Sequence, residues 1–452
     1  MDNSLEKKVT LPSLLKYTLP TVIMMIFFSF YTIVDGMFIS KFVGANALSA
    51  TNIVFPIINV ILGIGIMFAT GGSAIVAKKM GEQKIEEARE NFTLITISAL
   101  VLGLIIEILS IVFIKEIIYL LGSTQTLFSD CRDYLFYMVI FTPFIILKMF
   151  FDYFLVTAGV PKLALISSVA GGIVNMILDY VLIVPLSMGV KGAALATCIG
   201  YILPSFVGIV YFMNKKHLLH FVKTKFELKI IKDSCINGSS ELVTQLSSAV
   251  TTFLFNIVMI KMLGEDGVAA ITIMLYMQML LNSAYLGFTS GAQPRISYNY
   301  GCKDKEQLSR LVKYSLIIIS AFGVITFVLS RMSAEILISV FATKGTNLFY
   351  ISLDGFMLFS LAFLVAGINI FVSGMFTAYS NGKVSALISF LRTFIFFGVG
   401  MLFLPNILGV NGVWLVVPFA EVVTMLVSIY FIFKYKKEYM YGDFFKRKEL
   451  VA

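Results

Sequence analysis

The sequence predicts an all-α polytopic membrane protein with 12 transmembrane helices in two pseudo-twofold-related six-helix bundles. Three observations support this fold class. The 452-residue chain is 58% hydrophobic and only 13% charged, whereas about 25% of the residues of an ordinary soluble domain are charged. Apolar runs long enough to cross a bilayer recur from one end of the chain to the other. Many residues of the first half also recur 220 positions later in the second half.

Twelve apolar segments, separated by glycine, proline, asparagine and charged residues, are the predicted transmembrane helices. They span residues 14–40, 47–77, 91–121, 125–158, 162–184, 190–213, 234–263, 267–298, 308–342, 347–380, 384–404 and 410–436. The first run follows Lys7 and Lys8, as in a signal peptide, but it is too long and reaches Asp35 without a small-residue cleavage site. We therefore expect a retained first helix.

The basic residues are distributed unevenly between the two sides of the predicted membrane topology. An even number of helices places both termini on one side, and 26 of the 35 Lys and Arg residues fall there. Cytoplasmic loops carry such an excess of basic residues. We expect a multi-pass protein of the bacterial inner membrane with cytoplasmic N and C termini. Topology also accounts for the net charge of +9, because no nucleic-acid-reading motif accompanies it.

The densest basic segment lies between the sixth and seventh predicted helices. It divides the chain into an N-terminal lobe (1–213), a cytoplasmic linker (214–233), a C-terminal lobe (234–436) and a cytoplasmic tail (437–452). Glycine and proline residues recur at the 220-residue offset, as in Gly44/Gly264, Gly71/Gly291, Gly81/Gly301, Pro185/Pro405 and Gly189/Gly409. Since these residues fix turns and helix ends, we expect both halves to share helix lengths and turn geometry. Such repeats suit alternating access; a duplication without a present mechanistic role is the alternative.

Acidic residues at membrane depth are concentrated in the first half. A charged side chain costs ~2.5–3.5 kcal/mol or more at a helix centre unless it faces a cavity or a partner. Asp35 lies in the first helix, and Asp179 lies four residues after Asn175 in the fifth, so this second pair shares one helix face. Further polar groups that could join them are Thr197, Tyr134 and Asp152.

Oxygen ligands of this kind suit a hard monovalent cation or a proton. Two carboxylates in one low-dielectric pocket repel each other, so the pair can carry a proton or lose it to Na+. Na+ and H+ would then compete for one site formed by Asp35 and Asp179. The alternative for both residues is a structural role: a buried acid satisfied within the fold or, for Asp35, a helix-end cap. For Asp152, the alternative is a structural ion pair with Lys148, one helical turn earlier.

The second half lacks matching acids, because the positions 220 residues after Asp35 and Asp179 hold Phe255 and Val399. Its candidates for a pocket or a gate are Glu241, Asn256, Asn282 and Asn369. Glu241 lies near the cytoplasmic start of the seventh helix. It is either a substrate or gating residue or simply a helix-entry position.

Other classes of function find little support in the sequence. The four cysteines have no CxxC spacing, so neither a disulfide framework nor a zinc site is expected. The chain has two histidines, His217 and His220, and both lie in the linker, so we expect no enzyme and no cofactor. Trp414 follows a loop and is expected to anchor the chain at the membrane interface. We also expect a monomer in the lipid bilayer.

Seven segments carry a resemblance to a known family. They are IVDGMFISKFVG, ATGGSAIVAKKMGE, TAGVPK, NMILDYVLI, GVKGAALAT, NGSSELVTQLSS and TSGAQPRISYNYG. Together they make the chain similar to multidrug and toxic-compound extrusion (MATE) transporters, particularly a MepA-like bacterial branch, over essentially its whole length. The resemblance implies a V-shaped pair of six-helix bundles that exports cationic and amphipathic drugs in exchange for Na+ or H+.

The resemblance also implies a cation site in the N-terminal lobe. The family residues that form it fall here on Asp35, Asn175, Asp179 and Thr197. Relatives more usually have Asn at the position of Asp152, and the paired C-lobe acids of a NorM-like branch are absent. The alternative is a lipid-linked oligosaccharide flippase of the same superfamily. A flippase would favour a cationic groove, whereas the intramembrane cations here are Lys148 and Arg392.

Overall fold

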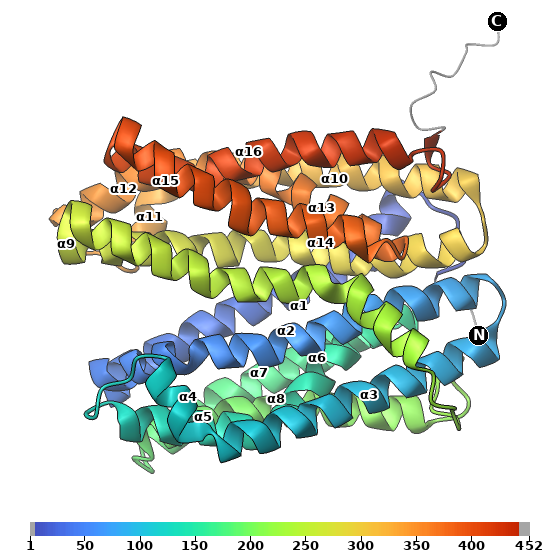
Figure 1. Cartoon of the computed structure of the whole chain (residues 1–452), viewed down its shortest axis with the longest axis horizontal. Coiled ribbons are helices and arrows are strands. Elements are labelled where there is room, and N and C mark those ends of the chain that lie inside the picture. The colour runs from blue at the N-terminus through green and yellow to red at the C-terminus, as the bar shows by residue number, and fades with distance from the viewer. Residues whose placement is uncertain (1–4, 443–452) are drawn as a thin grey trace, which may run out of the picture.

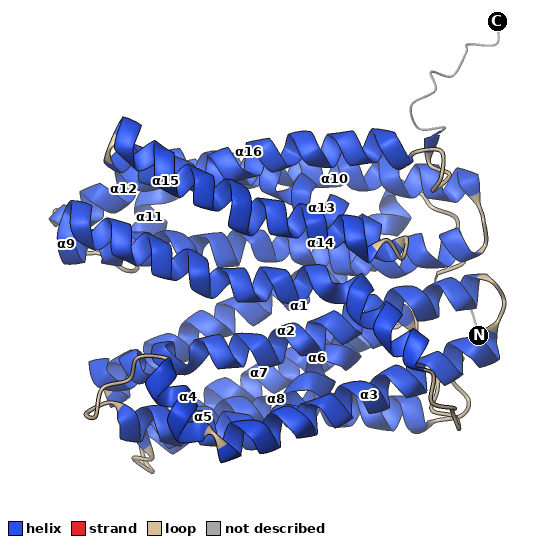
Figure 2. Ribbon diagram, viewed as in Figure 1, coloured by secondary structure: helices blue, strands red, loops and turns tan. Residues whose placement is uncertain are grey.

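The structure, a computed structural model, describes residues 5–442. The ten residues 443–452 of the predicted tail therefore lie outside the described residues, as do residues 1–4. Within the described range every regular element is helical (Figure 2). Helices satisfy their own backbone hydrogen bonds, which is what a segment crossing lipid requires.

The first half of the chain forms a bundle of eight α-helices, with a π-helical turn (Ile39–Val43) after the first. These helices are α1 (Leu11–Phe38), α2 (Ala45–Gly81), α3 (Ile85–Val112), α4 (Ile114–Leu120), α5 (Phe128–Ile140), α6 (Thr142–Thr157), α7 (Pro161–Ile183) and α8 (Gly189–Met213). We call this bundle the N lobe.

The second half forms the C lobe. Its helices are α9 (Leu228–Gly301), α10 (Lys305–Met332), α11 (Ala334–Ser339), α12 (Asn347–Phe359), α13 (Phe363–Ala378), α14 (Gly382–Phe390), α15 (Phe397–Leu408) and α16 (Val410–Tyr435). A 3₁₀ turn (Ser360–Ala362) joins α12 to α13, and a π-helical turn (Leu391–Phe396) joins α14 to α15.

The predicted membrane spans all have counterparts among the described residues. Ten spans are long and apolar enough to cross a membrane, and the pair α5 and α6, bent by 56°, makes a further one. The 74-residue α9 is one of the ten, but it breaks at Gly264 and supplies two spans. Counted in this way, the twelve predicted segments are present. The fold class predicted from the sequence is confirmed.

Glycines at equivalent positions turn the chain in the same way in both lobes. Gly44 and Gly264 have φ values of +121° and +66°, and Gly189 and Gly409 both have a φ of +59°. Side chains with a Cβ rarely adopt these angles, so glycine is the residue that can occupy such turns. The 220-residue offset therefore reflects shared backbone geometry.

The two lobes pack against each other through glycines at one end of the molecule. A Cβ on Gly81 would overlap the backbone carbonyl of Tyr298, and a Cβ on Gly301 would overlap that of Lys78. These two contacts exchange under the 220-residue offset, as expected for a pseudo-twofold axis between the lobes. In Figure 1 the lobes, blue to green below and yellow to red above, converge toward this end and diverge toward the bend of α9.

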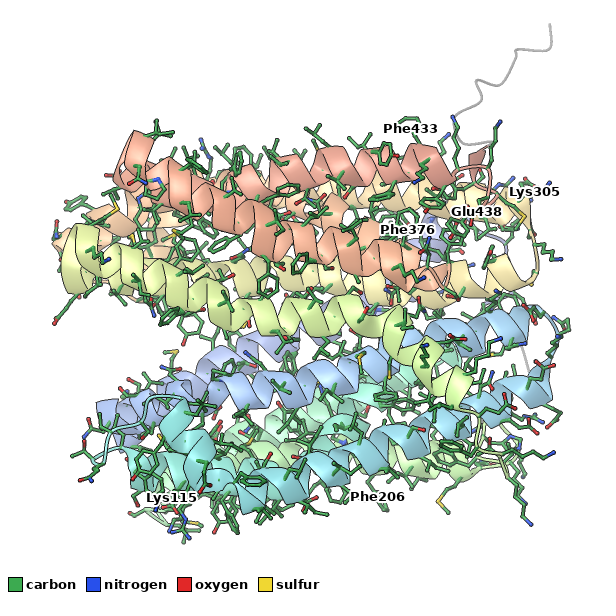
Figure 3. All side chains as sticks on the ribbon, in the orientation of Figure 1. Lys115, Phe206, Lys305, Phe376, Phe433 and Glu438 are labelled. Atoms are coloured by element: carbon green, nitrogen blue, oxygen red, sulfur yellow. The ribbon has the colours of Figure 1, made fainter. Side chains whose placement is uncertain are left out.

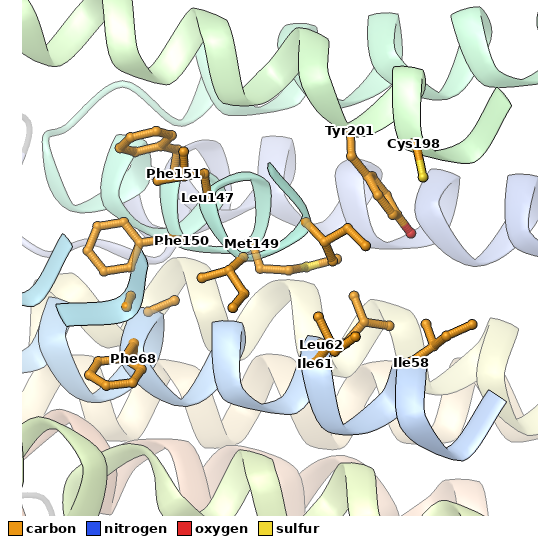
Figure 4. Close-up of a cluster of buried hydrophobic side chains, with 14 of the residues drawn as sticks. Ile58, Ile61, Leu62, Phe68, Leu147, Met149, Phe150, Phe151, Cys198 and Tyr201 are labelled. Atoms are coloured by element: carbon orange, nitrogen blue, oxygen red, sulfur yellow. The ribbon is translucent and has the colours of Figure 1, made fainter. Parts of the chain in front are cut away.

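Apolar side chains fill each lobe and also cover its outside. Figure 4 shows part of the N-lobe core, where side chains of α2, α6 and α8 such as Phe68, Phe150 and Tyr201 interdigitate. On the periphery, Phe206 is 62% exposed and points away from the bundle (Figure 3). The many exposed apolar side chains suit lipid contact rather than water.

The expected interfacial role of Trp414 is wrong. Its side chain is 1% exposed and belongs to the C-lobe core. A Cβ on Gly355 of α12 would lie 2.7 Å from the Trp414 ring, so this glycine makes the space that the indole fills. Trp414 therefore packs α16 against α12 inside the lobe instead of reaching the membrane surface.

Candidate functional site

Three helices of the N lobe bring the predicted polar cluster together. Asp35 lies near the end of α1, just before the π-helical turn, and α1 packs against α7. Asn175 and Asp179 lie one turn apart on α7, and both are buried. Thr197 lies on the neighbouring α8, and its hydroxyl is 3.4 Å from the Asn175 side-chain nitrogen. The four residues predicted as a cation site are therefore found in one region.

Close packing of α7 on α8 explains this placement. A Cβ on Gly171 would overlap the backbone carbonyl of Gly200, and a Cβ on Gly200 would lie 2.9 Å from the Cβ of Asn175. The absence of side chains at both glycines lets the two helix backbones approach. Thr197 lies one turn before Gly200, so the same approach places its hydroxyl beside Asn175.

Several oxygen atoms in this cluster lack hydrogen-bond partners among the described residues. They are Asp35 Oδ1, Asn175 Oδ1 and both carboxylate oxygens of Asp179. The carboxyl groups of Asp35 and Asp179 also lie within interaction distance of each other. Buried polar atoms without partners are costly, and facing carboxylates repel. A cation or a proton bound between them would relieve both penalties.

Buried tyrosines surround the two acids. Tyr134 on α5, a predicted pocket residue, interacts electrostatically with both Asp35 and Asp179. Tyr31 on α1 and Tyr201 on α8 interact electrostatically with each other, and both lie within electrostatic range of Asp35. Tyr31 and Tyr201 were not predicted from the sequence, because a tyrosine in an apolar helix gives no sign of which helix face it occupies.

Asp152 is paired rather than available as a free ligand. Its Oδ2 lies 2.8 Å from Lys148 Nζ, and its Oδ1 accepts a hydrogen bond of 2.6 Å from the Ser168 hydroxyl. The Lys148 ammonium also lies over the ring of Phe28, 4.6 Å from its centroid, and 5.7 Å from that of Tyr201. Of the two readings of Asp152, the structure favours the ion pair with Lys148.

The C lobe holds an ion pair of its own, between the partly buried Arg392 and the buried Glu421. Arg392 donates two hydrogen bonds to Glu421 Oε1, of 2.8 and 2.6 Å. The side-chain nitrogen of Asn369 donates to Glu421 Oε2 at 2.7 Å, while Asn369 Oδ1 accepts from Ser428 at 3.0 Å. Asn369 was predicted as a pocket or gating residue. The structure buries it completely and commits its amide to positioning Glu421.

The remaining C-lobe candidates lie on α9. Glu241 lines a small cavity at the junction of the two lobes. Asn256 and Asn282 lie on either side of the break at Gly264, and the Oδ1 atom of each is buried without a partner among the described residues. They do not line the cavity with Glu241. The three residues therefore do not form one site.

Within the described range, no three or more His, Cys, Asp or Glu side chains are grouped as a metal site would require. A cation bound in the N lobe would rely on two carboxylates together with amide and hydroxyl oxygens. Oxygen-only ligands of this kind suit hard cations.

Solved structures with this fold are known. A MATE protein in complex with MaL6 superimposes with a TM-score of 0.91 at 21% identity, covering 97% of this chain and 99% of its own. A multidrug resistance MATE transporter of the MOP superfamily in an outward-facing conformation also gives 0.91, at 20% identity and the same coverage. A MOP superfamily transporter from Pyrococcus furiosus, described as having a binding pocket of reverse polarity, gives 0.90 at 20% identity and 99% coverage of both chains.

Curated relatives align over nearly the whole chain. The multidrug export protein MepA of Staphylococcus saprophyticus is 24% identical over 415 residues, covering 90% of this chain and 89% of its own. MepA of Staphylococcus haemolyticus is 23% identical and covers 95% and 94%. The MatE family profile matches residues 20–181 and 242–402, one stretch in each lobe. The chain therefore belongs to the MatE family of MATE transporters.

Proposed function

We propose that the protein is a secondary active multidrug exporter that moves cationic and amphipathic compounds out of the cell in exchange for Na+ or H+. The observation that carries this proposal is the pair of Asp35 and Asp179 beside Asn175 and Thr197, with buried oxygens that lack partners among the described residues. Intramembrane acids without a basic partner are costly, which makes them functional-site candidates. The names of the MepA relatives support multidrug export.

Coupling would follow from competition at this cluster. With both carboxylates charged, mutual repulsion favours uptake of a cation or a proton from the side with the higher electrochemical potential. Asp35 lies beside the π-helical turn (Ile39–Val43), where the helical hydrogen-bond pattern changes. Such turns are frequent at functional sites. Neutralising Asp35 would therefore alter the balance of conformations available to α1.

Alternating access would use the two-lobe frame. The glycine contacts between Gly81 and Tyr298, and between Gly301 and Lys78, hold the lobes together at one end. The excess of basic residues assigns that end to the cytoplasm. The described arrangement would then be closed to the cytoplasm. We propose the same division into an N lobe, a basic linker, a C lobe and a tail, with both termini cytoplasmic and the protein acting as a monomer.

The alternative is transport of a lipid-linked oligosaccharide, whose pyrophosphate requires cationic ligands. Lys148 and Arg392 are the intramembrane cations predicted from the sequence, and each is paired with an acid, Asp152 and Glu421 respectively. Their charges are therefore already neutralised. This pairing favours export of cations over movement of a pyrophosphate.

The test is ethidium efflux in inverted vesicles or loaded cells, with Na+ and pH gradients imposed separately. Asp35→Asn and Asp179→Asn should each abolish gradient-driven efflux, because each removes one of the two coupling carboxylates. The matched control is Asp354→Asn, which changes an exposed acid of α12 and should export dye like the parent. Parental efflux by both N-lobe variants at equal expression would refute coupling through this cluster. Absence of any cationic substrate would favour the flippase.

A further inference from the structure

A small cavity lies where the two lobes meet, away from the N-lobe cluster. Its volume is about 20 Å³, enough for one water-sized occupant. The N lobe contributes Thr70 and Tyr153 to the lining, and the C lobe contributes the other six lining residues. The C-lobe residues are Glu241, Leu286, Thr289, Ser290, Gln293 and Ile370.

The polar groups of this cavity present oxygen atoms. The side-chain nitrogen of Gln293 donates to the Gly374 carbonyl at 3.2 Å, and its Oε1 has no partner among residues 5–442. Thr289 Oγ1 likewise has no partner in that part of the chain. Both side chains are only 4% exposed. Buried acceptors of this kind are costly unless something fills the space between them.

Two further hydroxyls have their hydrogen atoms engaged elsewhere. Thr70 donates to the Ile66 carbonyl at 2.9 Å, and Ser290 donates to the Gly287 carbonyl at 3.1 Å. A hydroxyl that donates its hydrogen to its own helix still has lone pairs to offer. The cavity therefore combines one carboxylate with several neutral oxygens, which is the ligand chemistry of a hard cation.

The surrounding charges favour a monovalent occupant. Arg392 is the basic group that acts on Glu241 through space, but its guanidinium is bound to Glu421, so this pair is neutral as a unit. Tyr153 is the other titratable group of the wall. When ionised, Glu241 contributes a single negative charge. A divalent ion would leave an uncompensated positive charge in a region of low dielectric, which is strongly unfavourable.

We propose that Glu241, Gln293, Thr289 and Thr70 form a second cation site, which binds one Na+-sized monovalent ion between the lobes. Thr70 belongs to the N lobe and the other three residues belong to the C lobe. Separation of the two lobes around the cavity therefore takes the site apart. An ion bound there stabilises the conformation in which the two lobes meet around the cavity, because a ligand favours the state it binds. The binding site requires only the fold. Its effect on transport rests on the proposed alternating access.

The experiment measures ²²Na+ binding to the purified full-length chain in an Asp35→Asn, Asp179→Asn background, which removes the proposed N-lobe site. We expect one Na+ per chain in this background. Adding Glu241→Gln should abolish the binding, and Gln293→Leu should weaken it ~10-fold, as loss of a neutral supporting ligand does. Glu265→Gln, an exposed acid on α9, is the matched control and should leave binding unchanged.

A second readout follows the lobes directly. Spin labels at Lys84 and Lys305, which are exposed on opposite lobes near the glycine contacts, should show a distance distribution that narrows with Na+ in the same background. Glu241→Gln should remove that response. No Na+ binding in the background, or binding unaffected by Glu241→Gln, would overturn the inference. If dye export still depended on Asp35 in that case, the proposed function would stand without this site. If Na+ binding depended on Glu241 but dye export did not depend on Asp35, this site would stand and the proposed function would fail.

Discussion

Gly81 provides a sharp test of how the lobes pack. In Gly81→Ala the new Cβ would overlap the carbonyl oxygen of Tyr298. It would also lie 2.9 Å from the carbonyl carbon of Tyr298 and 3.1 Å from the backbone nitrogen of Cys302. These neighbours are backbone atoms and cannot rotate away. Moving the carbonyl carbon from 2.9 Å to 3.4 Å, the near limit of ordinary contact, already requires the lobes to part by about 0.5 Å, and the closer carbonyl oxygen requires more.

The cost of this overlap falls on one conformation. Overpacking of this kind costs about 1–3 kcal/mol, which corresponds to a roughly 5- to 150-fold shift between two states. Because each lobe keeps its own core, Gly81→Ala should remain folded but lose population of the state in which Gly81 meets Tyr298. Gly301→Ala, the equivalent change across the pseudo-twofold axis, should act in the same way because its Cβ overlaps the Lys78 carbonyl.

The assay is the distance distribution between spin labels at Lys84 and Lys305, recorded beside dye efflux. Both variants should broaden the distribution toward longer distances and slow efflux. The control is Gly398→Ala, whose Cβ would meet no atom within 4 Å. If Gly81→Ala kept the parental distribution and rate, or if Gly398→Ala matched its effect, the packing argument would be refuted.

Three further changes test the buried charges and one turn. Glu421→Ala leaves Arg392 without its buried partner and should lower the free energy of unfolding by about 3–5 kcal/mol, whereas replacing both residues by Met should recover most of the loss in a thermal unfolding scan. Lys148→Met should likewise destabilise the N lobe by removing the partner of Asp152, and Asp152→Asn in the same chain should restore the parental unfolding midpoint. Gly409→Ala should cost about 1–3 kcal/mol, because its φ of +59° is unfavourable for alanine; a midpoint equal to that of the parent would contradict this reasoning.

Much of the architecture could be predicted because the bilayer and the backbone geometry restrict which residue types can occupy a position. Apolar runs give the spans, and glycines such as Gly44 and Gly264 mark equivalent turns in both lobes. The breaks within spans were less visible. The helix α5 ends at Ile140, and Phe141 separates it from α6, where the chain bends by 56°. The apolar pattern does not distinguish Phe141 from its neighbours.

Partner choice between helices was harder to predict than position within a helix. The i, i+4 spacing of Lys148 and Asp152 suggested their ion pair, which the structure contains. Arg392 and Glu421 lie 29 positions apart on different helices, so their pairing depends on tertiary packing that no local pattern encodes. The prediction for Trp414 was wrong for the same reason, because the space that its indole fills is made by Gly355 on a distant segment.

The central claim is that the N-lobe carboxylates couple cation entry to export of a cationic compound. Its most direct test is a proteoliposome measurement that records uphill ethidium transport and the entry of ²²Na+ or protons in the same vesicles. The parent should couple the two fluxes, and Asp35→Asn should lose both while still binding ethidium. Uphill ethidium transport by Asp35→Asn at the parental rate would contradict the claim.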